Sequence, residues 1–306
     1  MPVHLKPDKL VDLREAASYV LDGSLVALGG GLCGRLPMAL VREIIRQGRR
    51  RLHLVGSAHS IDVDLLIAAG CVQVCEESYV GFEQDLGLAP AYRAAAEAGA
   101  IEVRESCCDT ILNQLRAAEF GVPFMPVRGV KGSDIRRIHP EYAEVTCPFT
   151  AETLVAVPPL RPDVALLHAP LGDRRGNLHL GQPYVLDERF AAAAATVVAS
   201  VDRLASTSEV AAAGVTIPAY QVGAVVEVPF GAHPASCYPL YAYDRPHLAE
   251  YVAVGQAAGA ALAGYLARYV YDVGDEAEYR ARIGIERLER LGRFALSPEV
   301  WMDLFR

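Results

Sequence analysis

The sequence predicts an α/β protein with a mostly parallel sheet that carries helices on both faces. Three observations support this class. Short β-branched runs alternate with amphipathic helical runs through the first half, the alternation resumes after a loop-rich stretch at residues 129–150, and the chain becomes helical after Pro246. Alternating strands and helices form parallel sheets whose two faces are both covered. We therefore expect a single domain over residues 1–306, with a helical C-terminal extension from about residue 247.

The expected strands and helices follow one another in regular order. In the first half we expect strands at residues 24–30, 52–57, 71–76 and 101–106, and helices at residues 37–47, 62–69, 90–98 and 109–120. In the second half we expect strands at residues 163–169, 196–201 and 223–228. The stretch at 129–150 is long for a loop in a compact fold, and such loops commonly serve a function or contact a partner.

Composition and charge narrow the classes of function. Hydrophobic residues make up 52% of the chain and charged residues 22%, which is typical of a globular enzyme. The formal net charge is −8, and the basic run at residues 46–51 lies at the end of an expected helix, so we expect no nucleic-acid partner. The seven cysteines lack paired zinc-ligand spacing and predict a reduced, cytoplasmic protein without a metal site. We expect neither a signal segment nor a membrane span.

A glycine turn between the first expected strand and helix is the most informative motif. Residues 23–44 read GSLVALGGGLCGRLPMALVREI, with Pro37 near the start of the helix. Such a turn presents backbone N–H groups to a ligand. Gly29, Gly31 and Gly34 also satisfy G-x-G-x-x-G, but the next strand ends without the acidic residue that holds the ribose of a dinucleotide. A dinucleotide site is therefore disfavoured, while a ligand-binding turn and a tight turn without a ligand both stay open.

The run GGGLCGRLPMALV resembles the glycine signature of A-type subunits in family I coenzyme A transferases, which include the succinyl-CoA:3-oxoacid and glutaconate enzymes. Further stretches resemble the same family in the same order, and together the matches cover about residues 10 to 250. These stretches are Glu105 with the helix leading to GVPF at 121–124, GSD at 132–134, DVALLH at 163–168, GDRRGN at 172–177, and residues 217–234, which begin with IP and end with VPFGAHP.

The resemblance implies that the chemistry is divided between two chains. In the family, a glutamate carboxylate attacks the thioester while backbone amides of the glycine turn hold the developing oxyanion. Gly30 and Gly31 match that turn, so the resemblance gives them a catalytic role. The attacking glutamate lies in the B-type half, in a Glu- and Gly-rich motif that this chain lacks. The resemblance therefore implies a B-type partner, in a heterodimer or heterotetramer, and a CoA thioester substrate, with no permanently bound cofactor. The residues expected to contact the substrate are Gly29, Leu32, Arg35 and Ser133.

Glu105 is the carboxylate of this chain that we expect to take part in catalysis. In a strand over residues 101–106 its side chain shares a face with Ile101 and Val103, at the carboxyl end where open α/β sheets bind ligands. A carboxylate that only caps the following helix is an equal alternative, and Glu76 and Glu77 compete for the catalytic role. Relatives that open steroid rings as CoA thioesters carry a glutamate at the matching position and lack the glutamate of the B-type chain, so the resemblance also allows hydrolysis.

Other polar residues favour structural roles. His168 lies among apolar neighbours and is expected to be a hydrogen-bonded core histidine. Cys107 and Cys108 lie at a helix start and are expected to be structural. Three functions follow in order of preference: one chain of a CoA transferase that moves CoA between an acyl-CoA and a carboxylic acid, a ring-opening hydrolase of a cyclic acyl-CoA that uses Glu105, and a non-catalytic ligand-sensing module.

Overall fold

The computed structural model describes residues 7–181 and 184–293, and its main feature is a central sheet with strand order β11-β10-β8-β1-β2-β3-β4. These strands pair in parallel, and β9 adds an antiparallel partner to β8. The predicted mostly parallel sheet is confirmed. The strands are β1 (Leu25–Leu28), β2 (Leu52–Gly56), β3 (Val72–Glu77), β4 (Glu102–Val103), β8 (Val164–Gly172), β9 (Leu178–His179), β10 (Thr196–Leu204) and β11 (Val222–Glu227).

Helices cover both faces of this sheet, because successive side chains of each strand point to opposite sides. Val26 and Leu28 of β1 pack in one apolar cluster with the helices of the first half and the C-terminal helices, whereas Ala27 packs in a second cluster with α6 and α8. α1 (Leu13–Ser18) precedes β1, and the helices between the later strands are α2 (Met38–Arg46), α3 (Ile61–Ala68), α4 (Glu83–Leu86), α5 (Pro90–Glu97), α6 (Cys108–Phe120), α8 (Asp187–Ala193) and α9 (Thr207–Ala213).

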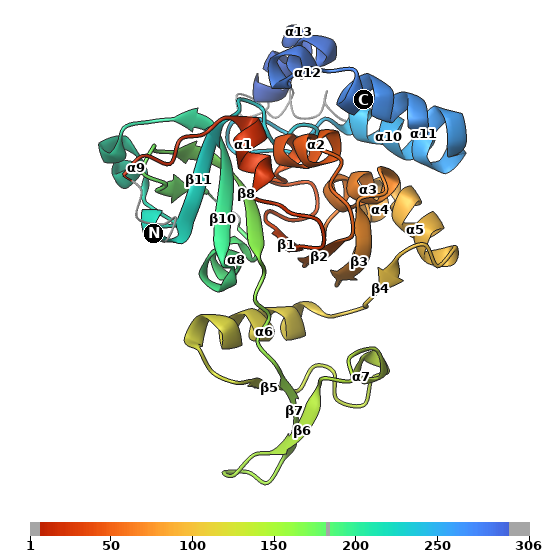
Figure 1. The fold of residues 1–306 in the computed structure, drawn as a ribbon, viewed down its shortest axis with the longest axis vertical. Helices are drawn as coiled ribbons and strands as arrows, with labels where there is room; N and C mark the ends of the chain where they lie inside the picture. Colours follow the sequence, from red (N-terminus) through yellow and green to blue (C-terminus); the bar gives the residue numbers. More distant parts are fainter. Residues whose placement is uncertain (1–6, 182–183, 294–306) are drawn as a thin grey trace.

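The predicted helical C-terminal extension is present and begins with Arg245. Its helices lie beside α2 and α3, in blue in Figure 1. They are α10 (Arg245–Ala257), α11 (Gly259–Leu266), a π-helical stretch over Ala267–Tyr271, α12 (Glu276–Ile283) and α13 (Ile285–Gly292). Within the described residues, no helix is long and apolar enough to cross a membrane.

A second, three-stranded antiparallel sheet replaces part of the predicted loop at residues 129–150. It has the order β5-β7-β6 and extends away from the central sheet beyond α6 (Figure 1). Its own small apolar cluster contains Val127, Tyr142 and Val155. The grouping of both sheets into one domain stays a prediction. The elements of this part are β5 (Met125–Val127), α7 (Ile135–Ile138), β6 (Ala143–Thr146) and β7 (Thr153–Val157).

The strand expected at residues 101–106 is much shorter than predicted. β4 forms only at Glu102–Val103, at the edge of the sheet, where it pairs with β3 alone. Glu102 is exposed and Val103 is half-buried, so no continuous apolar face carries the strand further.

Candidate functional site

The glycine turn lies at the point where the order of the strands reverses. After β1 the chain proceeds outward to β2, β3 and β4, then returns to add β8, β10 and β11 on the other side of β1. In open α/β sheets, ligands bind at the carboxyl ends of the strands beside such a switch point. The turn at residues 29–35 follows β1 directly and therefore occupies the position where a ligand site is expected.

Close approach of the backbone explains the glycine at position 30. Its φ is +79°, and a Cβ there would lie 2.4 Å from the carbonyl oxygen of Gly34. The turn is closed by reciprocal hydrogen bonds, from Gly31 N to Gly34 O at 3.0 Å and from Gly34 N to Gly31 O at 2.8 Å. Leu32 and Arg35 also adopt positive φ, at 52° and 51°. Such backbone strain in residues other than glycine is common at functional sites.

A buried ion pair between Asp187 and Arg35 stabilises the turn. Asp187, at the start of α8, accepts hydrogen bonds from Gly30 N at 2.9 Å and from two guanidinium nitrogens of Arg35 at 2.9 and 3.1 Å. Burial acts to raise the pKa of Asp187, but the Arg35 guanidinium and the Gly30 amide outweigh it and hold that pKa below its usual range. The turn is therefore fixed by a charged, bidentate contact.

The amides that were expected to bind an oxyanion are already paired within the chain. Gly30 donates to Asp187 and Gly31 to Gly34, while Leu32 N donates to Ala58 O at 2.7 Å. The catalytic role of Gly30 and Gly31 stays a prediction. Cys33 is the turn residue whose amide has no hydrogen-bond acceptor among the described residues.

A cleft of about 210 Å³ opens on the outer side of the turn. We call it the turn cleft. Ser236 ties one wall to the turn, because its N–H donates to Cys33 O and its carbonyl accepts from Arg35 N, both at 2.7 Å. The lining residues are Gly31, Leu32, Cys33, Gly34, Arg35, Val185, Ser236, Tyr238 and Tyr243.

The predicted site residues thus fall into two groups. Gly31, Leu32 and Arg35 line the turn cleft, and Gly29 is buried directly after β1 in the chain. Ser133 lies in the segment between β5 and α7, where its hydroxyl donates to the carbonyl of Val130 at 2.9 Å.

Glu105 lies beyond the end of β4 with an exposed side chain. The expected apolar strand face is therefore not its environment. Its carbonyl oxygen accepts a hydrogen bond from His139 Nε2 at 3.0 Å. The alternative of a helix cap is also not supported, because Cys107 is the N-cap of α6 and its N–H donates to Thr110 Oγ1. Cys107 thus has the structural role predicted for it.

His59, Glu77 and Asp62 form a buried cluster near the turn, which the sequence did not predict. His59 Nδ1 donates to Glu77 Oε1 at 3.0 Å, and His59 Nε2 lies 4.0 Å from Asp62 Oδ2. Burial lowers the pKa of His59, but Glu77 and Asp62 outweigh it and raise that pKa to about 9. Gly56 makes room for the pair, since a Cβ there would lie 2.2 Å from the His59 ring and 2.4 Å from Glu77.

The cluster is connected to the turn through the segment at residues 57–60. Ala58, which has a φ of +69°, presents its carbonyl to Leu32 N, and the Ser60 hydroxyl donates to Leu32 O. Asp62 lies in the first turn of α3, the helix that follows this segment. The segment that carries His59 therefore contacts the turn through the Ala58 carbonyl and the Ser60 hydroxyl, both of which bond to the backbone of Leu32.

His168 is buried with both ring nitrogens hydrogen-bonded, to Ser200 Oγ at 2.8 Å and to Asp202 Oδ2 at 2.9 Å. The prediction of a satisfied core histidine is confirmed.

Residues 11–228 match the sequence model of the family described as coenzyme A transferase. The chain belongs to the coenzyme A transferase family. The predicted family and enzyme class are confirmed, and the sensing module is wrong as a description of the chain.

Relatives within the coenzyme A transferase family extend the match over most of the chain. The A-type subunit of 3-oxoadipate CoA-transferase from Pseudomonas knackmussii is 33% identical over 90% of this chain and 98% of its own. The IpdA subunit of a cholesterol ring-cleaving hydrolase from Rhodococcus jostii is 33% identical over 91% of this chain and 96% of its own. A protein of Archaeoglobus fulgidus is 34% identical over 94% of this chain, which spans 65% of that protein's length.

A solved member of the family shares the fold. Glutaconate coenzyme A-transferase from Acidaminococcus fermentans superposes with a TM-score of 0.87 at 31% identity, over 92% of this chain and 95% of the other. The predicted coenzyme A transferase fold is therefore confirmed.

Proposed function

We propose that this chain is the A-type subunit of a heteromeric enzyme that moves CoA between an acyl-CoA thioester and a carboxylic acid. The observation that carries the proposal is the glycine turn at the switch point of the sheet, with a cleft that exposes its backbone. Relatives named as A-type subunits of CoA transferases support the assignment of a B-type partner, in a heterodimer or heterotetramer. The CoA thioester is a substrate in this proposal.

The turn cleft holds the thioester carbonyl. The amide of Cys33, which is not paired within the described chain, donates to the oxygen as it gains negative charge. The paired amides of Gly30 and Gly31 shape the turn that presents it. Because the Asp187–Arg35 pair fixes the turn before substrate arrives, little reorganisation accompanies the reaction.

The attacking carboxylate comes from the partner chain. Glu77, the carboxylate that pairs with His59 behind the turn, is buried and does not line the turn cleft. A glutamate of the B-type partner, placed over the cleft, attacks the thioester carbonyl to give an acyl anhydride and release CoA thiolate. The thiolate then attacks the glutamyl carbonyl of the anhydride, which forms an enzyme–CoA thioester and releases the acyl group as a carboxylate.

Reconstitution of the complex tests whether the chemistry is divided between the two chains. The chain is purified alone, and also after co-expression with a candidate B-type partner, and the exchange of CoA between an acyl-CoA and a carboxylic acid is measured. We expect a stable complex of two chain types and exchange only in that complex. Full exchange by this chain alone would contradict the proposal.

The ring-opening hydrolase is the second candidate, and the exposed position of Glu105 favours it. Glu105 is accessible at the carboxyl edge of the sheet, and the hydrolase subunit from Rhodococcus jostii is a relative over most of the chain. If Glu105 is a general acid–base, Glu105→Gln lowers turnover by about 10²–10⁴-fold while substrate binding survives. The exposed Glu102→Gln, in β4 just before Glu105, is the matched control. A near-normal rate in the Glu105 variant would exclude the hydrolase.

A further inference from the structure

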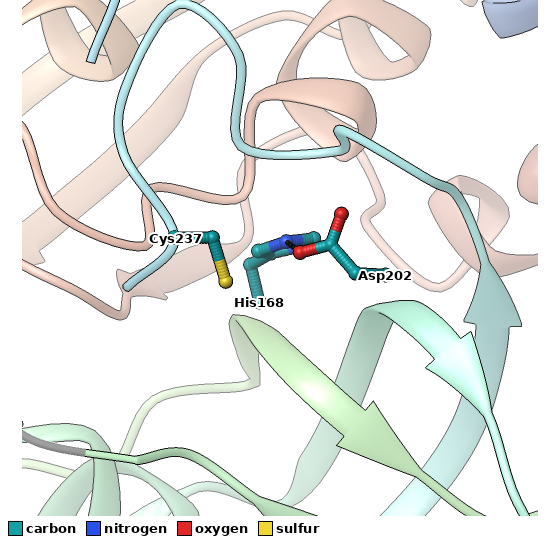
Figure 2. Close-up of side chains that lie close together, drawn as sticks. All are labelled: His168, Asp202 and Cys237. Carbon is teal, nitrogen blue, oxygen red and sulfur yellow. Dashed lines mark hydrogen bonds and ion pairs between the residues drawn. The ribbon is translucent and has the colours of Figure 1, made fainter. Parts of the chain in front are cut away.

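Three side chains that can bind a metal meet inside the molecule. One ligand atom each of His168, Asp202 and Cys237 lies within 4.8 Å of the other two. His168 and Cys237 are fully buried, and Asp202 is 8% exposed. Figure 2 shows the imidazole, the carboxylate and the thiol grouped together, from β8, from β10 and from the segment after β11.

The second ring nitrogen of His168 is oriented for ligation. Nδ1 lies 2.8 Å from Ser200 Oγ, and this hydroxyl donates to the carbonyl of Leu167 at 3.4 Å, so its oxygen is free to accept from Nδ1 when Nε2 binds a metal. Nε2 lies 2.9 Å from Asp202 Oδ2, and an ion bound there replaces the proton that joins these two atoms. Histidines that bind metals commonly donate their other N–H to an oxygen in this way.

The spacing of the donor atoms suits a small tetrahedral ion. His168 Nε2 and Asp202 Oδ2 are 2.9 Å apart, and the Tyr241 hydroxyl, a fourth donor beside the three ligands, lies 3.2 Å from Asp202 Oδ2 and 3.4 Å from His168 Nε2. Around a zinc ion with bonds of about 2.0 Å, neighbouring nitrogen and oxygen ligands are about 3.3 Å apart. The second oxygen of Asp202 accepts from Phe230 N at 2.6 Å, which holds the carboxylate in place.

Charge and access also fit a divalent transition metal. A carboxylate and a thiolate neutralise a doubly charged ion, so the buried centre carries no net charge and avoids the desolvation cost of an isolated ion. Imidazole and thiolate ligands favour zinc over magnesium or calcium. Asp202 and Tyr241 line a cavity of about 420 Å³, through which an ion can enter. The other lining residues are Pro170, Leu171, His179, Arg203, Pro229, Phe230, Pro239 and Leu240.

We propose that His168, Asp202 and Cys237 bind one transition-metal ion, best fitted by zinc, that enters from the cavity beside Tyr241. The ion ties the segment around Cys237 to β8 and β10. The neighbouring Ser236 bonds the glycine turn, so the ion braces one wall of the turn cleft. This role is structural and does not depend on which reaction the enzyme catalyses.

Titration with Co²⁺ alone tests the site. The full chain, reduced and stripped with a chelator, should take up one equivalent of Co²⁺, with the near-ultraviolet thiolate-to-cobalt band of a cysteine ligand, and Zn²⁺ should displace it. Cys237→Ser should abolish the band. Ser200→Ala should keep the band and lower the affinity by about 10–100-fold, the usual effect of losing a residue that orients a metal-bound histidine. Cys75→Ser, which alters a buried thiol elsewhere in the sheet, is the matched control and should leave binding unchanged.

Two results would overturn the proposal. A folded wild-type chain that takes up neither Co²⁺ nor Zn²⁺ would make the cluster a hydrogen-bonded core only. An unchanged band in Cys237→Ser would place the ion on other thiols, such as the exposed Cys108. Circular dichroism checks that each variant is folded, and Cys237→Ser is used because serine is close in size to cysteine.

Discussion

Buried charges fix the backbone of the glycine turn at the scale of single residues. Asp187 binds both the Gly30 amide and the Arg35 guanidinium, while His59 and Glu77 hold the segment that bonds Leu32. Removing one partner of such a pair leaves an uncompensated buried charge, which is costly. These pairs therefore keep the positive φ values of the turn in place without a bound ligand.

Alanine substitutions of Gly30 and Gly48 together separate the cost of a positive φ from the cost of a steric clash at the added Cβ. Gly30→Ala places a Cβ 2.4 Å from a carbonyl oxygen at a φ of +79°, whereas Gly48→Ala has a φ of +69° and open space around its Cβ. We expect the Gly48 variant to lose about 1 kcal/mol of unfolding free energy, and the Gly30 variant clearly more. Urea denaturation measures both losses, and equal losses would show that the turn yields easily to a side chain.

The His59 cluster makes stability depend on pH. The folded-state pKa of His59 is about 9 and its ordinary value is 6.5, so its contribution is fully present below pH 6.5 and is lost as pH rises through 9. The charged groups that face it are Glu77, Asp62 and Asp187. We expect the unfolding free energy to fall across this window in the wild-type chain, and much less in His59→Gln. The same slope in both proteins would remove His59 as the cause.

At the scale of elements, the local sequence pattern was sufficient to predict the unit in which a buried strand continues directly into a helix. The run of apolar residues before Gly29, the glycines and Pro37 together predicted β1, the turn and the start of α2, and the structure has them in that order. The strand at β4 was predicted too long and β6 was not predicted, although the edge strand β11 was predicted at residues 223–228 and is present. β4 and β6 have mostly exposed side chains, so their sequences lack the apolar runs that mark a buried strand.

The small sheet carries an exposed aromatic residue at its tip. Phe149, in the turn between β6 and β7, is 93% exposed. The sequence led us to expect that this region contacts a partner. Phe149→Ser should therefore change the stability of the free chain by no more than about 0.5 kcal/mol while weakening the complex with the B-type partner.

A core substitution is the control for that experiment. Phe190 in α8 is 1% exposed, and Phe190→Ala should cost about 3–5 kcal/mol of unfolding free energy in the free chain. Unchanged affinity of the Phe149 variant for the partner, measured by calorimetry, would place the interface elsewhere.

At the scale of the whole molecule, the site is assembled from segments far apart in the sequence. Residues 29–35 meet Val185 and Asp187 on one side and Ser236, Tyr238 and Tyr243 on the other. The sequence indicated the first segment because a glycine turn is a local motif. The others were missed because ordinary residues such as Asp187 acquire their role only through tertiary contacts.

The site that emerges supplies backbone, hydroxyl and guanidinium groups around the turn cleft. These groups can bind and polarise a thioester, and in the proposed mechanism a carboxylate of the partner carries out the covalent step. The division of the chemistry between two chains is therefore the central claim.

Trapping the covalent intermediate tests that claim most directly. The complex is incubated with acyl-CoA, treated with borohydride, and each chain is examined by mass spectrometry for the reduced glutamate. The proposed mechanism predicts the modification on a glutamate of the B-type partner, with none on this chain. A modified glutamate on this chain, at Glu105 or Glu77, would contradict it.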